Sequence, residues 1–188
     1  MNETIEVIRR RYSCRAFTGE PPGDEPLRAV AEAALAAPSA MNRQLWRVIV
    51  VKDRALIADM EAEGLRRLAA EPDQSAFERI QSRGGRLFYN APCLLVIPVD
   101  RREYGDSAVF DCGIITQTVA LAAASLGIDS CICGLAGQAF AGERAEEFRR
   151  RLGFPEGFTH GMTVLLGYAQ TAGGTPHAAD ISKLTFID

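Results

Sequence analysis

The sequence predicts a single globular domain that mixes helices and strands, and three observations support this fold class. The chain has 188 residues, enough for one core to bury about 70% of the surface that the unfolded chain exposes. Its 47% apolar and 24% charged residues are usual for a folded domain, which disfavours a disordered or disulfide-stapled class. Runs of β-branched residues alternate with segments of helical spacing. We expect one domain over residues 1–188, in which residues 169–188 form an extended carboxy-terminal arm.

The net charge is close to neutral. The chain carries 21 basic and 24 acidic side chains, a formal charge of −3, which argues against nucleic-acid binding through broad phosphate neutralisation. No uninterrupted apolar run reaches the roughly 18 residues of a membrane helix, and the amino terminus lacks the layout of a signal peptide. We therefore expect a cytoplasmic protein with neither a nucleic-acid nor a membrane partner.

Five cysteines are spread along the chain. Their number is odd and four of them have apolar neighbours, as small core residues do in a reducing compartment. Cys131 and Cys133 form a C-x-C pair, but no second pair stands at zinc-binding spacing. The pattern predicts neither a disulfide framework nor a metal site.

The first half of the chain predicts helices around two buried strands. Helical spacing places Ile5 and Ile8 on the inward side of a short helix, and Pro38 ends the next helix because the residue before a proline avoids the helical region. Strands are predicted where β-branched and aromatic residues cluster. The expected elements are helices over 4–11 and from 24 to before 38, a strand over 46–51, two amphipathic helices around 56–65 and 77–80, and a strand over 93–99.

The second half centres on a helix over Ser107–Leu126 that is apolar on nearly every face. Such a helix must be buried on nearly all sides, either under the sheet or against a partner subunit. The remaining expected elements are a strand over 128–133, a charged helix over 142–152, a strand over 162–168, and the arm, which would end in an edge strand.

Three separated segments have the chemistry to form the walls of one site for an anionic, aromatic ligand. The first, over 10–17, gathers arginines and a serine that suit a phosphate. The second, over 37–46, offers amides that match the edge of a flat heterocycle. The third has Gly134 at a strand end, where backbone can approach a ligand plane. Taken singly, each segment is as well explained by a solvated turn or an ordinary connection.

In combination, these segments resemble the nitroreductase family of flavoproteins, and the resemblance runs from Ile5 to Lys183. The motifs R-R-x-S-x-R-x-F over 10–17, A-P-S-x-x-N-x-Q-x-W over 37–46 and D-x-G-x-x-x-Q over 111–117 occur in the family's order. Leu126-Gly127 before the glycine strand end, and Gly167-Tyr168 followed by Pro176-His177, extend the match.

The resemblance implies an α+β fold in which helices flank a central, mostly antiparallel sheet. It also implies a homodimer with one tightly bound FMN at each of two shared interfaces, and NAD(P)H as a transient reductant. The apolar helix would supply dimer contacts, and the arm over 169–188 would cross onto the partner subunit and add a strand there.

The resemblance also assigns cofactor-binding residues. At the FMN phosphate and ribityl chain it places Arg10, Arg11, Tyr12 and Ser13, with Arg15 at the pyrimidine edge of the ring. Against the ring and ribityl, partly from the other subunit, it places Pro38, Ser39, Ala40, Asn42 and Gln44. Near flavin N5 it places the backbone of Cys133, Gly134 and Leu135, and Lys183 supplies a second phosphate cation. No side chain is expected to act as acid, base or nucleophile.

The implied activity is a ping-pong hydride transfer from NAD(P)H through flavin N5 to an electron-poor acceptor such as a nitroaromatic or a quinone. Two alternatives remain open at this stage. One is another flavin-dependent enzyme of the same fold, an oxidase, dehydrogenase or dehalogenase-like protein. The other is a non-catalytic FMN-binding redox module.

Overall fold

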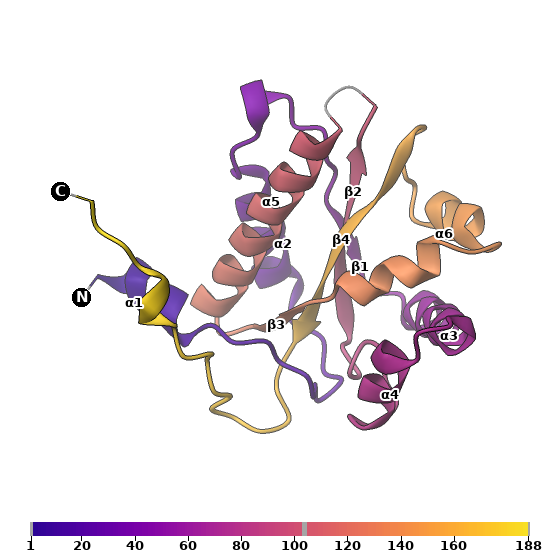
Figure 1. The fold of residues 1–188 in the computed structure, drawn as a ribbon, viewed down its shortest axis with the longest axis horizontal. Helices are drawn as coiled ribbons and strands as arrows, with labels where there is room; N and C mark the ends of the chain where they lie inside the picture. The colour runs from indigo at the N-terminus through magenta and orange to yellow at the C-terminus, as the bar shows by residue number, and fades with distance from the viewer. Residues whose placement is uncertain (1, 103–104, 188) are drawn as a thin grey trace.

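A four-stranded sheet lies between two layers of helices (Figure 1). The computed structural model describes residues 2–102 and 105–187. The strands are β1 (Ile49–Val51), β2 (Cys93–Asp100), β3 (Asp129–Ile132) and β4 (Phe158–Gly167). The helices are α1 (Glu3–Arg10), α2 (Asp24–Leu35), α3 (Arg54–Ala70), α4 (Ser75–Gln81), α5 (Asp106–Ser125) and α6 (Ala145–Arg151).

The sheet has the order β1-β2-β4-β3, and its three ladders are all antiparallel. The longest ladder joins β2 to β4, and its register shifts between Ile97 and Pro98. The expectation of an α+β fold around a mostly antiparallel sheet is therefore confirmed.

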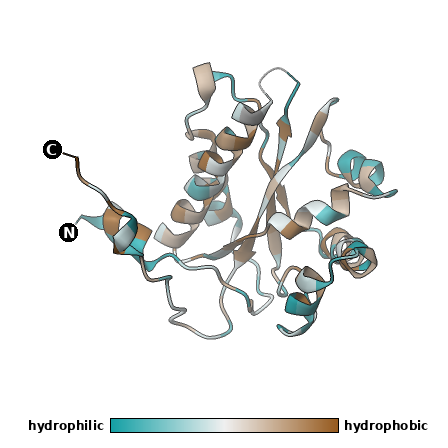
Figure 2. Cartoon of the chain, in the orientation of Figure 1, coloured by the Kyte–Doolittle hydropathy of each residue, from teal (hydrophilic) through white to brown (hydrophobic). Residues whose placement is uncertain are grey.

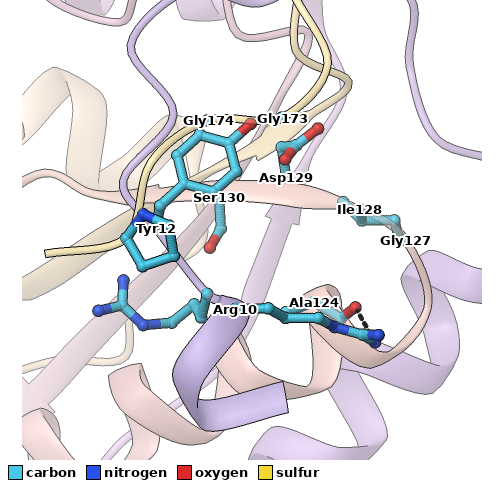
Figure 3. A pocket seen from close by; sticks show the side chains of 11 residues that line it. Arg10, Tyr12, Ala124, Gly127, Ile128, Asp129, Ser130, Gly173 and Gly174 are labelled. Atoms are coloured by element: carbon cyan, nitrogen blue, oxygen red, sulfur yellow. Dashed lines mark hydrogen bonds between the residues drawn. The ribbon is translucent and has the colours of Figure 1, made fainter. Parts of the chain in front are cut away.

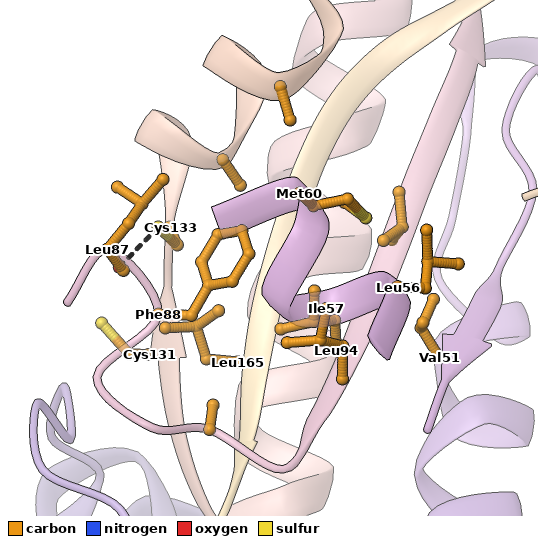
Figure 4. Packing of buried hydrophobic residues seen from close by; sticks show 14 of the residues in the cluster. Val51, Leu56, Ile57, Met60, Leu87, Phe88, Leu94, Cys131, Cys133 and Leu165 are labelled. Atoms are coloured by element: carbon orange, nitrogen blue, oxygen red, sulfur yellow. Dashed lines mark hydrogen bonds between the residues drawn. The ribbon is translucent and has the colours of Figure 1, made fainter. Parts of the chain in front are cut away.

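The two faces of the sheet carry separate cores, because neighbouring residues of a strand point to opposite faces. Leu94 and Val96 of β2 point toward the core that contains α3, α4 and α6, whereas Leu95 and Ile97 point toward α2 and α5. None of these four side chains has exposed surface. Figure 4 shows α3, with its buried Met60, packed over the first of these faces.

The long apolar helix α5 is buried on only one side of the described chain. Ile115 and Val119 have no exposed surface, but Val109, Phe110 and Ile114 are 46%, 72% and 42% exposed. Figure 2 shows hydrophobic residues along the whole helix. By length and composition, the stretch from 107 to 125 would even qualify as a membrane span, which a count of uninterrupted apolar residues overlooks. Its packing against α2, β3 and β4 instead identifies it as a core helix.

The expected inward orientation of Ile5 and Ile8 is wrong for the single chain. These side chains are 38% and 44% exposed, and the buried residue of α1 is Val7. The physical reason is that α1 lies on the outside of α5 and does not enter either core, so only a narrow stripe of it is covered.

Some element boundaries also differ from the sequence-based expectations. The strand expected over 46–51 is regular only from Ile49, although Trp46 forms an isolated bridge with Val99. The helix expected from 142 begins at Ala145, and β4 begins at Phe158, four residues before the expected start. A 3-10 helix, η2 (Gly134–Phe140), follows β3 and was not expected.

The carboxy-terminal arm runs back across the side of the molecule that carries α1 (Figure 1). Over residues 170–187 it contains a 3-10 turn, η3 (Ile181–Lys183), and no strand is formed in this part of the chain. Leu184, Phe186 and Ile187 are 60%, 81% and 95% exposed. The expected edge strand therefore stays a prediction that only a second copy of the chain could fulfil.

Candidate functional site

The first candidate segment lies along the outer edge of β3. The Cys14 N–H donates to the Ser130 carbonyl at 2.8 Å, and Ser13 forms a parallel bridge with Ser130. Successive side chains of an extended segment point to opposite sides, and Cys14 is accordingly buried while Arg15 is exposed. This contact brings the first segment beside the strand that leads into the third segment.

A pocket of about 310 Å³ opens where α1 ends. Figure 3 shows Arg10 and Tyr12 on its wall, with Ser130 of β3 also lining it beside Tyr12. Arg10 Nη2 donates to the Ala124 carbonyl at 3.0 Å, which ties the end of α1 to the end of α5. Arg11 also lines the pocket, and its buried Nε has no hydrogen-bond partner among the described residues. A guanidinium donor left unpaired at a pocket wall suits an anionic ligand.

The Tyr12 side chain serves a different purpose from that of its neighbours. Burial and a hydrogen bond to Asp129 raise the pKa of Tyr12 above its ordinary value. Asp129 also accepts the Ala169 N–H at 2.9 Å, and a Cβ on Gly174 would lie 1.9 Å from the Tyr12 ring. The tyrosine thus fastens the first segment to the start of the arm while its side chain also lines the pocket.

The second candidate segment forms a loop with an unusual backbone around the 3-10 turn η1 (Ala40–Asn42). Met41, Asn42 and Gln44 have φ angles of 51°, 53° and 50°, in the left-handed region. Two bonds within the loop support this shape: Ser39 Oγ accepts the Gln44 N–H at 2.9 Å, and Gln44 Nε2 donates to Asn42 Oδ1 at 2.8 Å. Non-glycine residues in this region are strained, and such strain concentrates at functional sites.

The first and second segments lie at opposite ends of α5. Asp111, near the beginning of α5, accepts the Ala40 N–H, whereas Arg10 contacts Ala124 near its end. Thirteen residues separate these two points in α5, which corresponds to about 20 Å at 1.5 Å per residue. Figure 1 shows the 3-10 turn of the loop and α1 at the two ends of the helix. One chain therefore does not bring all three segments into one site.

The third candidate segment continues from β3 into η2. Cys133 is 7% exposed, and burial raises the pKa of its thiol to about 12. Its Sγ contacts the Leu87 carbonyl at 3.9 Å, so this side chain is a protonated core residue at neutral pH. Gly134 is exposed directly after it, which leaves the backbone open to a ligand plane.

The remaining predicted residues lie in three places. Leu135 is half-buried beside Gly134, and Pro38 is exposed at the start of the strained loop. Lys183 lies in the arm and pairs with Asp180 at 3.7 Å, where it is largely exposed. The first and third segments therefore meet in one chain, whereas the loop and Lys183 lie apart from them.

Sequence reasoning missed two carboxylates that organise these segments. Asp129 bonds to Tyr12 and to the start of the arm, and Asp111 bonds to the strained loop. The motif D-x-G-x-x-x-Q contains Asp111, but it gives no indication of the partner. For Asp129 we find no sequence signal.

Comparisons with known proteins give relatives in both sequence and structure. A family model described as the nitroreductase family matches residues 8–168. An Archaeoglobus fulgidus protein, provisionally named NADH dehydrogenase/NAD(P)H nitroreductase, is 32% identical over 171 residues, which cover 89% of this chain and 86% of the relative. A Desulfitobacterium hafniense nitroreductase crystallised with bound FMN is 59% identical, covers 100% of both chains and gives a TM-score of 0.97. A Bacteroides fragilis nitroreductase with bound FMN is 26% identical, also over 100% of both chains, with a TM-score of 0.89.

Proposed function

The chain belongs to the nitroreductase family and is an NAD(P)H-dependent flavin oxidoreductase, and from this premise we propose that it works as a cytoplasmic homodimer with two shared FMN sites. The observation that carries the proposal is the separation of the candidate segments along α5, with Arg10 at one end and the Ala40 loop at the other. A second copy in a twofold dimer can bring its loop to the first copy's arginines, and the same symmetry builds the second site.

The residues present fit FMN. The unpaired Arg11 Nε and the neighbouring Ser13 offer donors for a phosphate. Arg15 is exposed on the same side of the segment, where a permanent cation favours negative charge on the pyrimidine edge of a flavin. Gly134 leaves room at the ring plane, and Asn42 and Gln44 of the second copy carry amides for the ring edge. When bound, FMN supplies hydride acceptance from NAD(P)H and delivery of two electrons to a second substrate.

The surface of the chain supports a homodimer. Ile5 and Ile8 of α1, the outer side of α5 around Phe110, and the end of the arm all expose large apolar side chains. Figure 2 shows that α1 and the arm carry them on the same side of the molecule. Large apolar side chains exposed on several elements in this way are typical of an interaction surface. A second copy laid on α5 would give it the burial on both sides that its composition requires.

We also propose where the partner's arm would add its strand. The β3 edge of the sheet is met by Ser13, whereas β1 is the opposite, open edge. A groove of about 420 Å³ runs beside β1, with Leu35 and Val50 on its walls. The alternating residues Leu184 and Phe186 have the period of a strand. Adding them to β1 would cover an edge that otherwise remains unpaired.

The proposed reaction is ping-pong. NAD(P)H and an electron-poor aromatic acceptor, such as a nitroarene or a quinone, would occupy the same space over the flavin in turn. The chain's part is to hold the phosphate through Arg11, to place a positive charge through Arg15, and to set the ring between Gly134 and the second copy's loop. No acid or base is needed from the protein, since the cofactor carries the chemistry.

Anaerobic titration of the purified protein tests the reductase proposal. We expect a yellow dimer that contains one FMN per chain and loses its flavin absorbance when NADPH or NADH is added in stoichiometric amount. A nitroarene or a quinone should then restore the colour. A flavin that stays oxidised with both nicotinamides would contradict the proposal and favour the non-catalytic redox module.

Mixed dimers test the shared site directly. A heterodimer that joins an Arg11→Ala chain to an Asn42→Ala chain has one site with both defects and one site with none. We therefore expect it to bind one FMN per dimer with wild-type affinity, although each parent homodimer binds FMN weakly. If both segments served one chain's own site, no site would recover.

A further inference from the structure

A buried carboxylate outside the predicted site residues holds the strained loop. Asp111 lies in the second turn of α5 and is 5% exposed. Its two carboxylate oxygens accept the Ala40 N–H at 3.1 and 3.2 Å. A buried charge is strongly unfavourable unless donors satisfy it. This pairing therefore fixes the position of Ala40 relative to α5 across 71 residues of sequence.

The loop that begins at Ala40 needs such support. Met41, Asn42 and Gln44 all adopt left-handed backbone angles, which non-glycine residues keep only where their surroundings hold them. At the far end of the loop, buried Trp46 forms an isolated bridge with Val99 of β2. The loop is thus fixed at both ends, by β2 on one side and by Asp111 on the other.

We propose that Asp111 is a positioning residue that presets the loop for the FMN held by the second copy, an inference that rests on the proposed shared site. Asp111 acts through the Ala40 backbone and does not itself touch the cofactor. Its role is to keep the amides of Asn42 and Gln44 in the orientation that a ring edge requires. A loop that is already in its bound shape loses less conformational freedom on binding, so the cofactor binds more tightly.

Three substitutions separate this role from simple loss of stability. Asp111→Ala removes the acceptor, whereas Asp111→Asn keeps one acceptor oxygen. Ala40→Pro removes the donor and leaves the carboxylate in place. Ser39 has φ −135° and ψ 156°, an extended conformation that permits a following proline, and proline is accepted at the first position of a helical turn.

The main measurement is the affinity for FMN, which is obtained from the quenching of FMN fluorescence. The visible circular dichroism of the bound flavin reports on its surroundings in the same samples. We expect Asp111→Ala and Ala40→Pro each to weaken FMN binding about tenfold, as loss of one charge-assisted hydrogen bond does. Asp111→Asn should recover most of the affinity. Wild-type affinity in both Asp111→Ala and Ala40→Pro would overturn the proposal, whether or not turnover changes.

Glu63→Ala is the matched control. Glu63 is a buried carboxylate of α3, 3% exposed, that pairs with Arg66 on the other side of the sheet. Its loss should lower the melting temperature at least as much as Asp111→Ala does, yet leave FMN affinity unchanged. A weakening of FMN binding equal to that of Asp111→Ala would mean that any buried carboxylate has this effect, and would overturn the specific role.

Mixed dimers then show which segment Asp111 serves. Asp111→Ala paired with Arg11→Ala should restore one tight FMN site per dimer, whereas Asp111→Ala paired with Asn42→Ala should restore none. The opposite pattern would overturn the proposal. Ala40→Pro takes the same place in this experiment if Asp111→Ala fails to fold. The pair Arg11→Ala and Asn42→Ala tests the shared site by itself, so failure there is distinguishable from failure of Asp111.

Discussion

Arg11 and Tyr12 are neighbours in sequence and line the same pocket, but their side chains have different partners. Arg11 keeps a buried donor atom without a partner at the pocket wall, while the Tyr12 ring lies against Gly174 and bonds to Asp129. The resemblance to the family assigns both residues to the cofactor, and for each of them this assignment stays a prediction. The structure adds that Tyr12 also anchors the arm, whereas Arg11 keeps a donor atom that no described residue pairs.

Arg11→Ala should weaken FMN binding by about 10–100-fold, because the phosphate loses a charge-assisted hydrogen bond of about 1.5–3 kcal/mol. Equilibrium dialysis against free FMN measures the change. Arg9→Ala on the exposed side of α1 serves as a control for the loss of one positive charge. Equal affinities for Arg11→Ala and the wild type would remove Arg11 from the site.

His160 predicts a pH dependence of stability. Its ring stacks on Phe140 at 4.7 Å and its Nε2 lies 2.9 Å from Thr163 Oγ1, and burial lowers its pKa from 6.5 to about 4. In the unfolded chain His160 therefore becomes protonated as the pH falls below about 6.5, whereas in the folded chain it stays neutral until about pH 4. Stability from this group is complete above pH 6.5 and falls between these two values, by on the order of 1–3 kcal/mol.

Urea unfolding at pH 7.5 and pH 4.5 measures this loss. We expect His160→Gln to flatten the dependence of the unfolding free energy on pH in that window. His177→Gln should leave the dependence as it is, because His177 is exposed in the arm. An unchanged slope in His160→Gln would show that other groups cause the acid sensitivity.

At the scale of elements, the parts that sequence could predict are those that depend on local patterns. Helical spacing places α2 and α3 because each buries one stripe of apolar residues, and β2 stands out because all of its residues are buried. The bond from Asp111 to Ala40 joins residues 71 apart, and the early start of β4 follows from pairing with Asp100 of β2. Neither the bond nor the start of β4 leaves a pattern in the nearby sequence, so only the structure shows them.

The junction between the first segment and the arm gives a prediction at this scale. A Cβ on Gly174 would lie 1.9 Å from the Tyr12 ring, so Gly174→Ala should displace the ring or the arm and destabilise the fold by about 1–3 kcal/mol. Thermal unfolding and amide exchange of residues 169–174 measure the effect. Gly23→Ala is the control, since its Cβ would meet Pro26 at an ordinary 3.6 Å.

A double substitution then identifies the cause. If the clash with the ring is responsible, adding Gly174→Ala to Tyr12→Ala should have almost no further effect, whereas independent effects would add. Full additivity of the two changes would mean that Gly174 is required for some other reason.

At the scale of the whole molecule, α5 sets the distance between the candidate segments. Its length places the arginine segment and the strained loop about 20 Å apart, and its outer face exposes Phe110 and Ile114. Under the proposed shared site, the same helix separates the two candidate segments within one chain and offers the apolar surface on which a second chain would bring them together. Cofactor binding and dimer formation should therefore rise and fall together.

Removal of residues 176–188 tests this coupling. In the proposed dimer, the exposed side chains of Leu184, Phe186 and Ile187 would gain burial on the second copy, at about 25 cal/mol per Å² of apolar surface. We expect the truncated protein to dissociate at concentrations at which the full chain is dimeric, as measured by sedimentation velocity, and to release FMN as it does so. The substitutions L184S and F186S in the full-length chain should act in the same direction. Ser182→Ala in η3 should change neither property, because the hydroxyl of Ser182 bonds to Asp180 at the start of this turn. A truncated protein that stays dimeric and fully loaded with flavin would show that α5 alone holds the two copies together and that the arm is dispensable.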